Sequence, residues 1–262
     1  MVYVIAISNE KGGVAKTTTT YSLGASLAET NRKVLLIDLD PQGNLSLANG
    51  IEPAKAINTS HDVLMNGLNI REAIAKTSTP SMDIVPASPA LIEVEQNLPM
   101  RSNYAFTLNN ALRQQPLEYD YIFLDCPPSM GAITYNALTA AELLIIPTQA
   151  EYFSAYALRD MMTLIRRVRR DSNPRLAYRI LITLLDQRNR THKVIREQLE
   201  QTFGSGLFQT VIEIDTRLRE SPIIGLPITQ YRPTSRGSQQ YRVLAQELID
   251  YVQQQKDSQS AQ

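Results

Sequence analysis

One stretch constrains what this chain can fold into more than any other: Glu10 to Thr18, with the sequence E-K-G-G-V-A-K-T-T. It follows an apolar run from Val2 to Ile7 and precedes a segment with helical spacing. A strand, a glycine-bearing loop, a Lys-Thr pair and a helix are the usual order of a phosphate-binding loop, in which backbone N–H groups converge on phosphate oxygens. The stretch therefore predicts an α/β fold with a nucleotide site.

The loop departs from the usual pattern G-x-x-x-x-G-K-[ST], because Glu10 and Ala15 stand where that pattern has glycine. It also carries a second lysine, Lys11, ahead of two glycines that permit a close approach of the backbone. Lys16 is placed to neutralise β- and γ-phosphate oxygens, and Thr17 to ligate Mg²⁺. We therefore expect ATP and Mg²⁺ as ligands, with Ala15 as the residue that the pattern does not explain.

The composition sets the class of protein. The 262 residues suit one α/β domain spanning 1–262. A single cysteine, Cys126, excludes a disulfide framework and a cysteine-based zinc site, and the two histidines, His61 and His192, lie far apart in sequence. No apolar run approaches the ~20 residues of a membrane span, so we expect a cytoplasmic protein.

Charge is distributed unevenly along the chain, although the net charge is zero. Residues 1–158 contain 9 Lys and Arg against 15 Asp and Glu, whereas residues 159–236 contain 15 against 8. The predicted phosphate site thus lies in an acidic first part, and a basic, arginine-rich part follows it. Such asymmetry bears on binding partners and not on the fold.

Apolar runs and helical patterns alternate, which predicts a doubly wound, mostly parallel sheet flanked by helices. Strands are expected at Tyr3–Ser8, Lys33–Asp38, Met82–Pro86, Tyr121–Asp125, Leu143–Pro147 and Arg179–Leu185, with weaker candidates at Thr210–Ile214 and Leu226–Thr229. Helices are expected at Thr17–Glu29, Asn103–Gln114, Ala132–Ala140, Ala155–Arg170, Thr191–Phe203 and Gly237–Gln254, before a disordered polar tail at about 256–262. In such sheets, ligands bind beyond the carboxyl ends of the strands.

Aspartates lie at the ends of two predicted strands. Asp38 and Asp40 belong to D-L-D-P-Q-G-N, where carboxylates can hold Mg²⁺ or orient a water for attack on the γ-phosphate. The same residues also suit an ordinary turn, so a structural role stays open. Asp125 ends an apolar run and is the second magnesium element expected of a P-loop nucleotidase. Cys126 beside it is expected to be a small buried residue.

With these motifs in view, the chain resembles the ParA/Soj/MinD group of deviant-Walker-A ATPases, and most of all the ParA/Soj type. The resemblance rests on K-G-G-V-A-K-T-T-T, V-L-L-I-D-L-D-P-Q-G-N, Y-D-Y-I-F-L-D-C-P-P-S, L-I-I-P-T-Q-A-E-Y-F, R-L-R-E-S-P and P-I-T-Q-Y-R-P-T-S-R-G-S, which together span nearly the whole chain. It implies the P-loop NTPase fold of that group. No helix-turn-helix segment precedes the loop, which is typical of the short members.

The resemblance implies roles for individual residues. Lys11 would be the signature lysine, reaching the partner subunit's phosphates in a homodimer with ATP sandwiched between the subunits. Asp38 and Asp40 would form switch I, with Asp40 activating the water, and Asp125 would be the Walker B residue. The stretch 227–233 would pack on adenine. The implied nucleotide-binding set is Lys11, Gly12, Gly13, Val14, Ala15, Lys16, Thr17, Thr18, Pro227 and Ile228, with catalytic residues Lys11, Lys16 and Asp40 and metal ligands Thr17, Asp38 and Asp125.

The basic part gains an interpretation from the same resemblance. Arg188 and Arg217 match positions implicated in non-specific binding of double-stranded DNA by the ATP dimer. The candidate DNA-binding set is Arg188, Arg190, Lys193, Arg217 and Arg219. Phosphate contacts by several such cations would give affinity that is independent of sequence and falls with salt. The cluster at 166–170 is equally well the solvated side of an amphipathic helix, so its role stays open.

The predicted function is therefore that of a slow, adaptor-stimulated ATPase that positions cargo on the nucleoid. A ParB-like or McdB-like adaptor would stimulate hydrolysis, and the cargo would be a plasmid, a chromosome or a protein organelle such as a carboxysome. A MinD-like ATPase that cycles on a membrane is one alternative, but it needs a basic amphipathic C-terminal helix, and the segment 251–258 is polar. A metabolic P-loop enzyme is the other; a nitrogenase-like one would need more cysteines.

Overall fold

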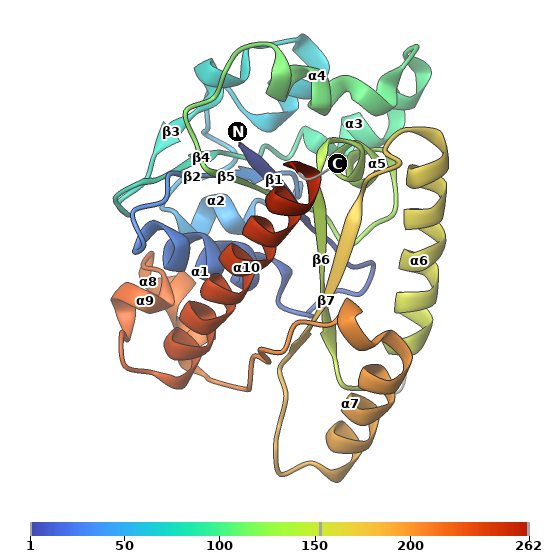
Figure 1. Ribbon diagram of the computed structural model, residues 1–262. Helices are drawn as coiled ribbons and strands as arrows, with labels where there is room; N and C mark the ends of the chain where they lie inside the picture. The colour runs from blue at the N-terminus through green and yellow to red at the C-terminus, as the bar shows by residue number, and fades with distance from the viewer. Residues whose placement is uncertain (1, 152–153, 261–262) are drawn as a thin grey trace.

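A twisted sheet of seven strands forms the centre of the computed structural model, which describes residues 2–151 and 154–260 (Figure 1). The strand order is β3-β4-β2-β5-β1-β6-β7, and every neighbouring pair is parallel except β3 and β4. The strands are β1 (Tyr3–Ile7), β2 (Val34–Asp38), β3 (Ala75–Lys76), β4 (Met82–Val85), β5 (Tyr121–Asp125), β6 (Leu143–Gln149) and β7 (Ala177–Thr183). The predicted doubly wound, mostly parallel sheet is confirmed.

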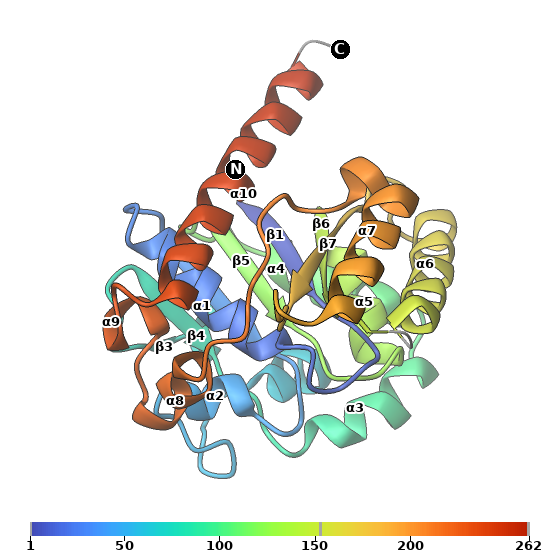
Figure 2. The same cartoon turned by 90° about the horizontal axis from the view of Figure 1, so that it is seen from below.

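Helices cover both faces of the sheet (Figures 1 and 2). The α-helices are α1 (Lys16–Ala28), α2 (Asn44–Ala48), α3 (Leu91–Asn97), α4 (Thr107–Arg113), α5 (Ala132–Ala140), α6 (Ser154–Asp171), α7 (Arg190–Phe203), α8 (Arg217–Ile224), α9 (Ile228–Tyr231) and α10 (Arg236–Ser260). Short helical turns are a π-helix η1 (Asp62–Asn66) and the 3-10 helices η2 (Ile70–Ala73), η3 (Leu98–Met100), η4 (Tyr104–Phe106) and η5 (Gly204–Gly206).

Successive residues of each strand enter two different apolar clusters. In β1, Val4 and Ala6 join the cluster formed with α3 to α7, whereas Ile5 and Ile7 join the cluster formed with α1, α2, α8, α9 and α10. Both sets are buried, because helices lie on either side of the sheet and leave neither face in water. This two-sided burial explains why the central strands are near-continuous apolar runs.

The register of the sheet aligns the ends of the three central strands. Ile7, Asp38 and Asp125 end β1, β2 and β5, and Asp125 is paired with both of the others. The loops that follow these strands therefore leave the sheet at one edge, the carboxyl-end edge, which Figure 2 shows from below. The phosphate-binding loop and both aspartate motifs lie at this edge.

The predicted secondary structure is wrong in several places. Thr210–Ile214 is not a strand, although Glu213 forms an isolated bridge with Leu185. The proposed strand Leu226–Thr229 instead contains the start of α9, because Gly225 ends α8 and Pro227 caps the next helix. The last helix continues to Ser260, beyond the expected end at Gln254, so the tail predicted at 256–262 is helical as far as it is described. Tyr152 and Phe153, which belong to one of the quoted motifs, lie outside the described residues.

Candidate nucleotide-binding site

Side chains from three strand ends hold the backbone of the phosphate-binding loop between β1 and α1. Asn9 donates from Nδ2 to the Pro147 carbonyl over 2.8 Å and accepts the Lys11 N–H at Oδ1 over 3.0 Å. Gln149 of β6 donates to the Gly13 carbonyl over 3.2 Å, and Thr183 Oγ1 at the end of β7 donates to the Val14 carbonyl over 3.0 Å. The loop is therefore fixed at several points along its course.

Ala15 occupies a backbone conformation that favours glycine. Its φ is 66° and its ψ is 35°, in the left-handed region, and it caps the N-terminus of α1 without a side-chain hydrogen bond. For a residue other than glycine, this left-handed conformation costs roughly 1–2 kcal/mol of conformational energy. The usual pattern has glycine at this position for that reason, and the chain forms the same turn with alanine at a cost in strain.

The two lysines of the loop point to different places. Lys16 is buried and donates from Nζ to the Lys11 carbonyl over 3.1 Å, inside the curve of the loop. Burial lowers its pKa, which the nearby Asp125 and Asp40 partly offset. Lys11 lies on the outside, where its Nζ is 2.5 Å from Glu151 Oε2 and 3.4 Å from Gln149 Oε1. Lys16 is therefore directed into its own loop, whereas Lys11 is directed away from it.

Asp125 receives two hydroxyl donors from α1. Thr17 Oγ1 donates to Oδ2 over 2.8 Å, and Thr20 Oγ1 donates to Oδ1 over 2.9 Å. Burial and the neighbouring Asp38 raise the pKa of Asp125 to about 8, although the hydroxyl donors oppose the shift. A buried carboxylate that holds its proton this strongly is a site where a cation would be favourable.

Asp38 and Asp40 have different surroundings. Asp38 is buried and accepts the N–H and the hydroxyl of Ser46 over 2.8 Å and 2.7 Å, and burial raises its pKa to about 6. Asp40 is 9% exposed, accepts the Gln42 N–H over 2.9 Å, and donates its own N–H to Asp38 Oδ1 over 3.2 Å. The structural role is therefore confirmed, because these carboxylates hold the turn that leads into α2. Their role toward magnesium and the attacking water stays a prediction.

The donor set fits magnesium. Within residues 2–151 and 154–260, no three His, Cys, Asp or Glu side chains gather closely enough to hold a metal ion by themselves. Mg²⁺ is usually held by one or two carboxylates together with phosphate oxygens and waters, and not by a complete protein cage. The Thr17 hydroxyl beside Asp125, with Asp38 in register on the next strand, suits that incomplete arrangement.

The structure places the candidate adenine contacts in the core. Pro227 and Ile228 are buried at the start of α9, and Ile228 belongs to the apolar cluster beside α1. Both residues are buried, so a base contact at this place would have to involve neighbouring residues. Their role in nucleotide binding stays a prediction.

The candidate DNA-binding cations are exposed and come from two segments that touch. Leu185 exchanges backbone hydrogen bonds with Ile212 and Ile214, which brings the loop after β7 beside the segment that leads into α8. Arg188, Arg190 and Lys193 flank the first segment, and Arg217 and Arg219 flank the second. The guanidinium of Arg188 forms two hydrogen bonds with Asp186, at 3.1 and 3.2 Å, and that of Arg217 lies 3.9 Å from Asp215. These cations share the carboxyl-end edge with the phosphate loop.

The arginine cluster of α6 lies at the opposite edge. It is in the last turns of α6, which lead into the first residue of β7. Arg169 donates to the Leu176 carbonyl over 2.8 Å, Arg167 lies over the Tyr135 ring, and Arg170 pairs with Asp171. These arginines have partners within the fold and are remote from Arg188 along β7.

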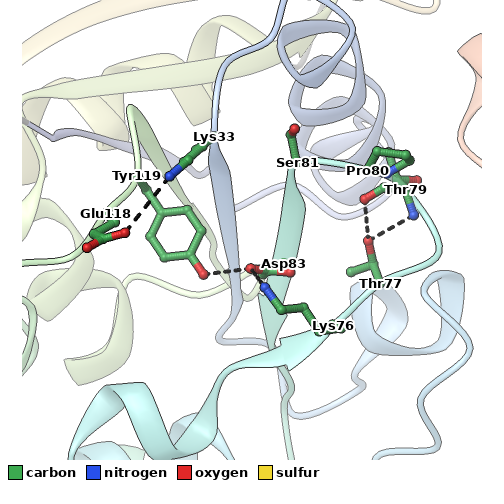
Figure 3. A pocket seen from close by; sticks show the side chains of 9 residues that line it. All are labelled: Lys33, Lys76, Thr77, Thr79, Pro80, Ser81, Asp83, Glu118 and Tyr119. Atoms are coloured by element: carbon green, nitrogen blue, oxygen red, sulfur yellow. Dashed lines mark hydrogen bonds and ion pairs between the residues drawn. The ribbon is translucent and has the colours of Figure 1, made fainter.

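A polar pocket of about 350 Å³ also opens at this amino-end edge, near the starts of β2, β4 and β5 (Figure 3). Its side chains satisfy one another: Asp83 accepts the Tyr119 hydroxyl over 2.8 Å and the Lys76 ammonium over 2.7 Å. Lys33 lies 3.9 Å from Glu118 across the opening. The pocket and the phosphate loop lie at opposite ends of the strands.

Sequence reasoning missed the residues that support the site. Gln149 and Glu151 belong to the motif L-I-I-P-T-Q-A-E-Y-F, but the sequence assigned them no role. Asn9 directly precedes the phosphate-binding loop and was also given no role. Thr183 and Thr20 gave no signal, because a threonine at a strand end or in a helix is common and its partner is visible only in three dimensions.

No helix of the described chain is both long and apolar enough to cross a membrane.

Comparison with known proteins agrees with this geometry. A family model described as an AAA domain matches residues 2–178. The chain is 40% identical to the chromosome partitioning protein ParA of Myxococcus xanthus over 248 residues, which cover 94% of this chain and 87% of that one. It is 39% identical to the sporulation initiation inhibitor protein Soj of Bacillus subtilis over 94% of this chain and 97% of that one. The chain belongs to the ParA/Soj family.

A solved structure shows the same fold with ligands. The cobyrinic acid a,c-diamide synthase of Mycobacterium smegmatis, with bound ADP and magnesium, superposes with a TM-score of 0.84 at 33% identity and covers 97% of this chain and 96% of that one. Members of the ParA/Soj family are P-loop ATPases, and the sheet order and helix layers found here agree with that assignment.

Proposed function

We propose that this chain is a partition-type ATPase that dimerises around ATP, binds DNA without sequence preference and positions a cargo. Its membership of the ParA/Soj family supports the ATPase and the partition role. The dimer, the DNA and the adaptor are the further content of the proposal.

The two lysines of the loop carry this proposal. Lys16 lies inside its own loop, where its ammonium group would supply the charge that a P-loop needs. Lys11 extends outward and pairs with Glu151, and both side chains are partly exposed. A second cation directed away from its own loop would be available to the phosphates of another subunit, which supports the proposed role in trans.

Magnesium would be held by Thr17 and Asp125, with Asp38 beside them, and would neutralise phosphate charge when bound. Lys16 would bind the phosphate chain through its ammonium group. Asp40, the least buried of the three aspartates, would accept the hydrogen bond of the attacking water and orient it. Asp40→Ala should therefore bind ATP and fail to hydrolyse it.

DNA would bind at the carboxyl-end edge, across Arg188, Arg190, Lys193, Arg217 and Arg219. Contacts with phosphates alone give affinity without sequence preference. A dimer doubles the number of these cations, so ATP would increase DNA affinity by assembling them. A cargo-linked adaptor would then stimulate hydrolysis and release the protein from the nucleoid.

The deciding experiment is the assembly state of Lys11→Ala at saturating ATP, measured by light scattering. We expect a monomer for this variant and a dimer for the wild type and for Lys33→Ala, a surface lysine at the opposite edge. A persistent dimer of Lys11→Ala would contradict the role in trans. Measuring DNA retention and liposome binding side by side distinguishes the proposed function from that of a membrane-cycling ATPase. Product analysis with small-molecule acceptors tests for a synthetase activity.

A further inference from the structure

The loop that follows Asp125 is held by a carboxylate from a different helix. Glu95 of α3 accepts the backbone N–H of Ala132 at Oε2 over 2.6 Å and the hydroxyl of Ser129 at Oε1 over 3.3 Å. Ala132 is the first residue of α5, whose capping residue, Gly131, has no side chain to accept this N–H. Glu95 therefore caps α5 from outside and places a negative charge at the end where a helix favours it.

Gly131 makes room for this contact. A Cβ atom at this position would collide with the Glu95 carboxylate. The backbone at Gly131 has φ −84° and ψ −159°, an extended conformation that other residues also adopt, so the turn itself does not require glycine. Glycine suits this position because, without a Cβ atom, the Glu95 carboxylate can approach the backbone closely.

The loop lies between two functional parts of the molecule. It begins directly after Asp125, the carboxylate that accepts the Thr17 hydroxyl. Farther along, Ser129 and Met130 line a surface pocket of about 450 Å³ together with Lys11. A contact that fixes Ser129 and Ala132 therefore fixes the path between the candidate magnesium site and the second lysine.

We propose that Glu95 is a positioning residue for nucleotide hydrolysis, acting through the loop 127–131 and not through contact with the reacting atoms. The proposal rests on the ATPase function above. Loss of the Glu95 carboxylate frees the loop, lowers the fraction of molecules with the loop in place, and slows hydrolysis while nucleotide binding at Lys16 persists.

The chain contains no tryptophan, so Met130→Trp, at a side chain that is 39% exposed, gives a single fluorescent reporter on this loop. In that background we would measure emission, kcat and KM for Glu95→Ala, Glu95→Gln, Gly131→Ala and the double variant Glu95→Ala with Gly131→Ala. Glu93→Ala is the matched control, because it removes an exposed carboxylate from the same helix.

Glu95→Ala and Gly131→Ala should each shift the emission and lower kcat about tenfold, the loss expected for a hydrogen bond to a charged group, with KM within about twofold. The double variant should lose no more than either single one, because both changes remove the same contact. Glu95→Gln should regain most of the rate. Glu93→Ala should match the wild type.

Three results would overturn the proposal: unchanged emission and kcat in Glu95→Ala, losses that multiply to about a hundredfold in the double variant, or a lower melting temperature with kcat intact. If the wild type hydrolyses no ATP, the proposed function fails. The emission of Glu95→Ala then still decides whether Glu95 holds the loop.

Discussion

Lys11 Nζ lies 2.5 Å from Glu151 Oε2, so the second lysine of the phosphate loop is paired within its own subunit. In an ATP dimer of the proposed kind, Lys11 must leave Glu151 before it reaches the partner's phosphates. The lysine and glutamate side chains are 29% and 47% exposed, and ion pairs in such surroundings contribute about 0.2–1 kcal/mol. The pair is thus weak enough for ATP to replace it.

Glu151→Gln keeps the shape of the side chain and removes its charge. We expect dimers to form at ATP concentrations about two- to fivefold lower, since each subunit no longer has to break the ion pair. Light scattering against ATP concentration measures the midpoint. The same change in a Lys11→Ala background should leave a monomer, and a dimer there would assign the effect to something other than this pair.

Lys16→Ala should abolish ATP binding, because the only ammonium group inside the described loop is lost. Calorimetry measures the affinity, and circular dichroism checks that the fold is retained. Wild-type affinity in this variant would contradict the assignment of the phosphate site.

Ala15→Gly should stabilise the protein. Glycine removes roughly 1–2 kcal/mol of left-handed strain and loses about 0.4–1 kcal/mol through the greater freedom of the unfolded chain, which leaves a gain of up to about 1.6 kcal/mol. Denaturant unfolding without nucleotide measures the change. Ala25→Gly, in the middle of α1, is the control and should destabilise the protein. A destabilised Ala15→Gly would show that the left-handed turn is not strained.

The raised pKa of Asp125 predicts that the stability of the protein depends on pH. The pKa of Asp125 is about 8 in the folded protein, above the usual range of an unfolded aspartate near 4. Its contribution to stability is therefore complete below pH 4 and is lost as the pH rises through 8. Relative to the wild type, Asp125→Asn should gain stability with rising pH, at up to about 1.4 kcal/mol per pH unit. Parallel pH profiles of the two unfolding free energies would contradict the shift.

Arg188→Glu combined with Arg217→Glu should weaken DNA binding strongly and retain the ATP dimer. The charge change removes phosphate contacts and introduces repulsion, and the residual binding should depend less steeply on salt. Filter binding at several salt concentrations measures both quantities. The matched control, Arg166→Glu with Arg170→Glu, makes the same charge change at the opposite edge of the sheet. Equal losses in both pairs would indicate a general charge effect.

A strand of this fold is predictable from the sequence when both of its faces are buried. The six main strands are predictable because helices cover both faces of the sheet, and their sequences are continuous apolar runs. β3 has two residues, Ala75 and Lys76, at the edge of the sheet, and it leaves no such pattern. The failed strand at Leu226–Thr229 shows the converse, because its apolar residues are buried by a short helix that begins after Pro227.

The same contrast holds for the site. Lys16, Thr17 and Asp125 are predictable because a loop and a strand end bring them together through local order. Glu95 is not, since its partners Ser129 and Ala132 are far along the chain and only the packing of α3 on α5 joins them. Ala15 is the instructive case: its unusual identity is visible in the sequence, and its strain is visible only in the backbone angles.

The course of α10 has a practical consequence for imaging and immobilisation. The helix starts near the carboxyl-end edge at Arg236 and extends so that Tyr251 lies against Arg179, near the start of β7 (Figures 1 and 2). Its last described turns are therefore on the side away from the phosphate loop and the exposed arginines. A fluorophore or a surface tether attached after this helix would leave accessible the face that we propose to meet nucleotide and DNA.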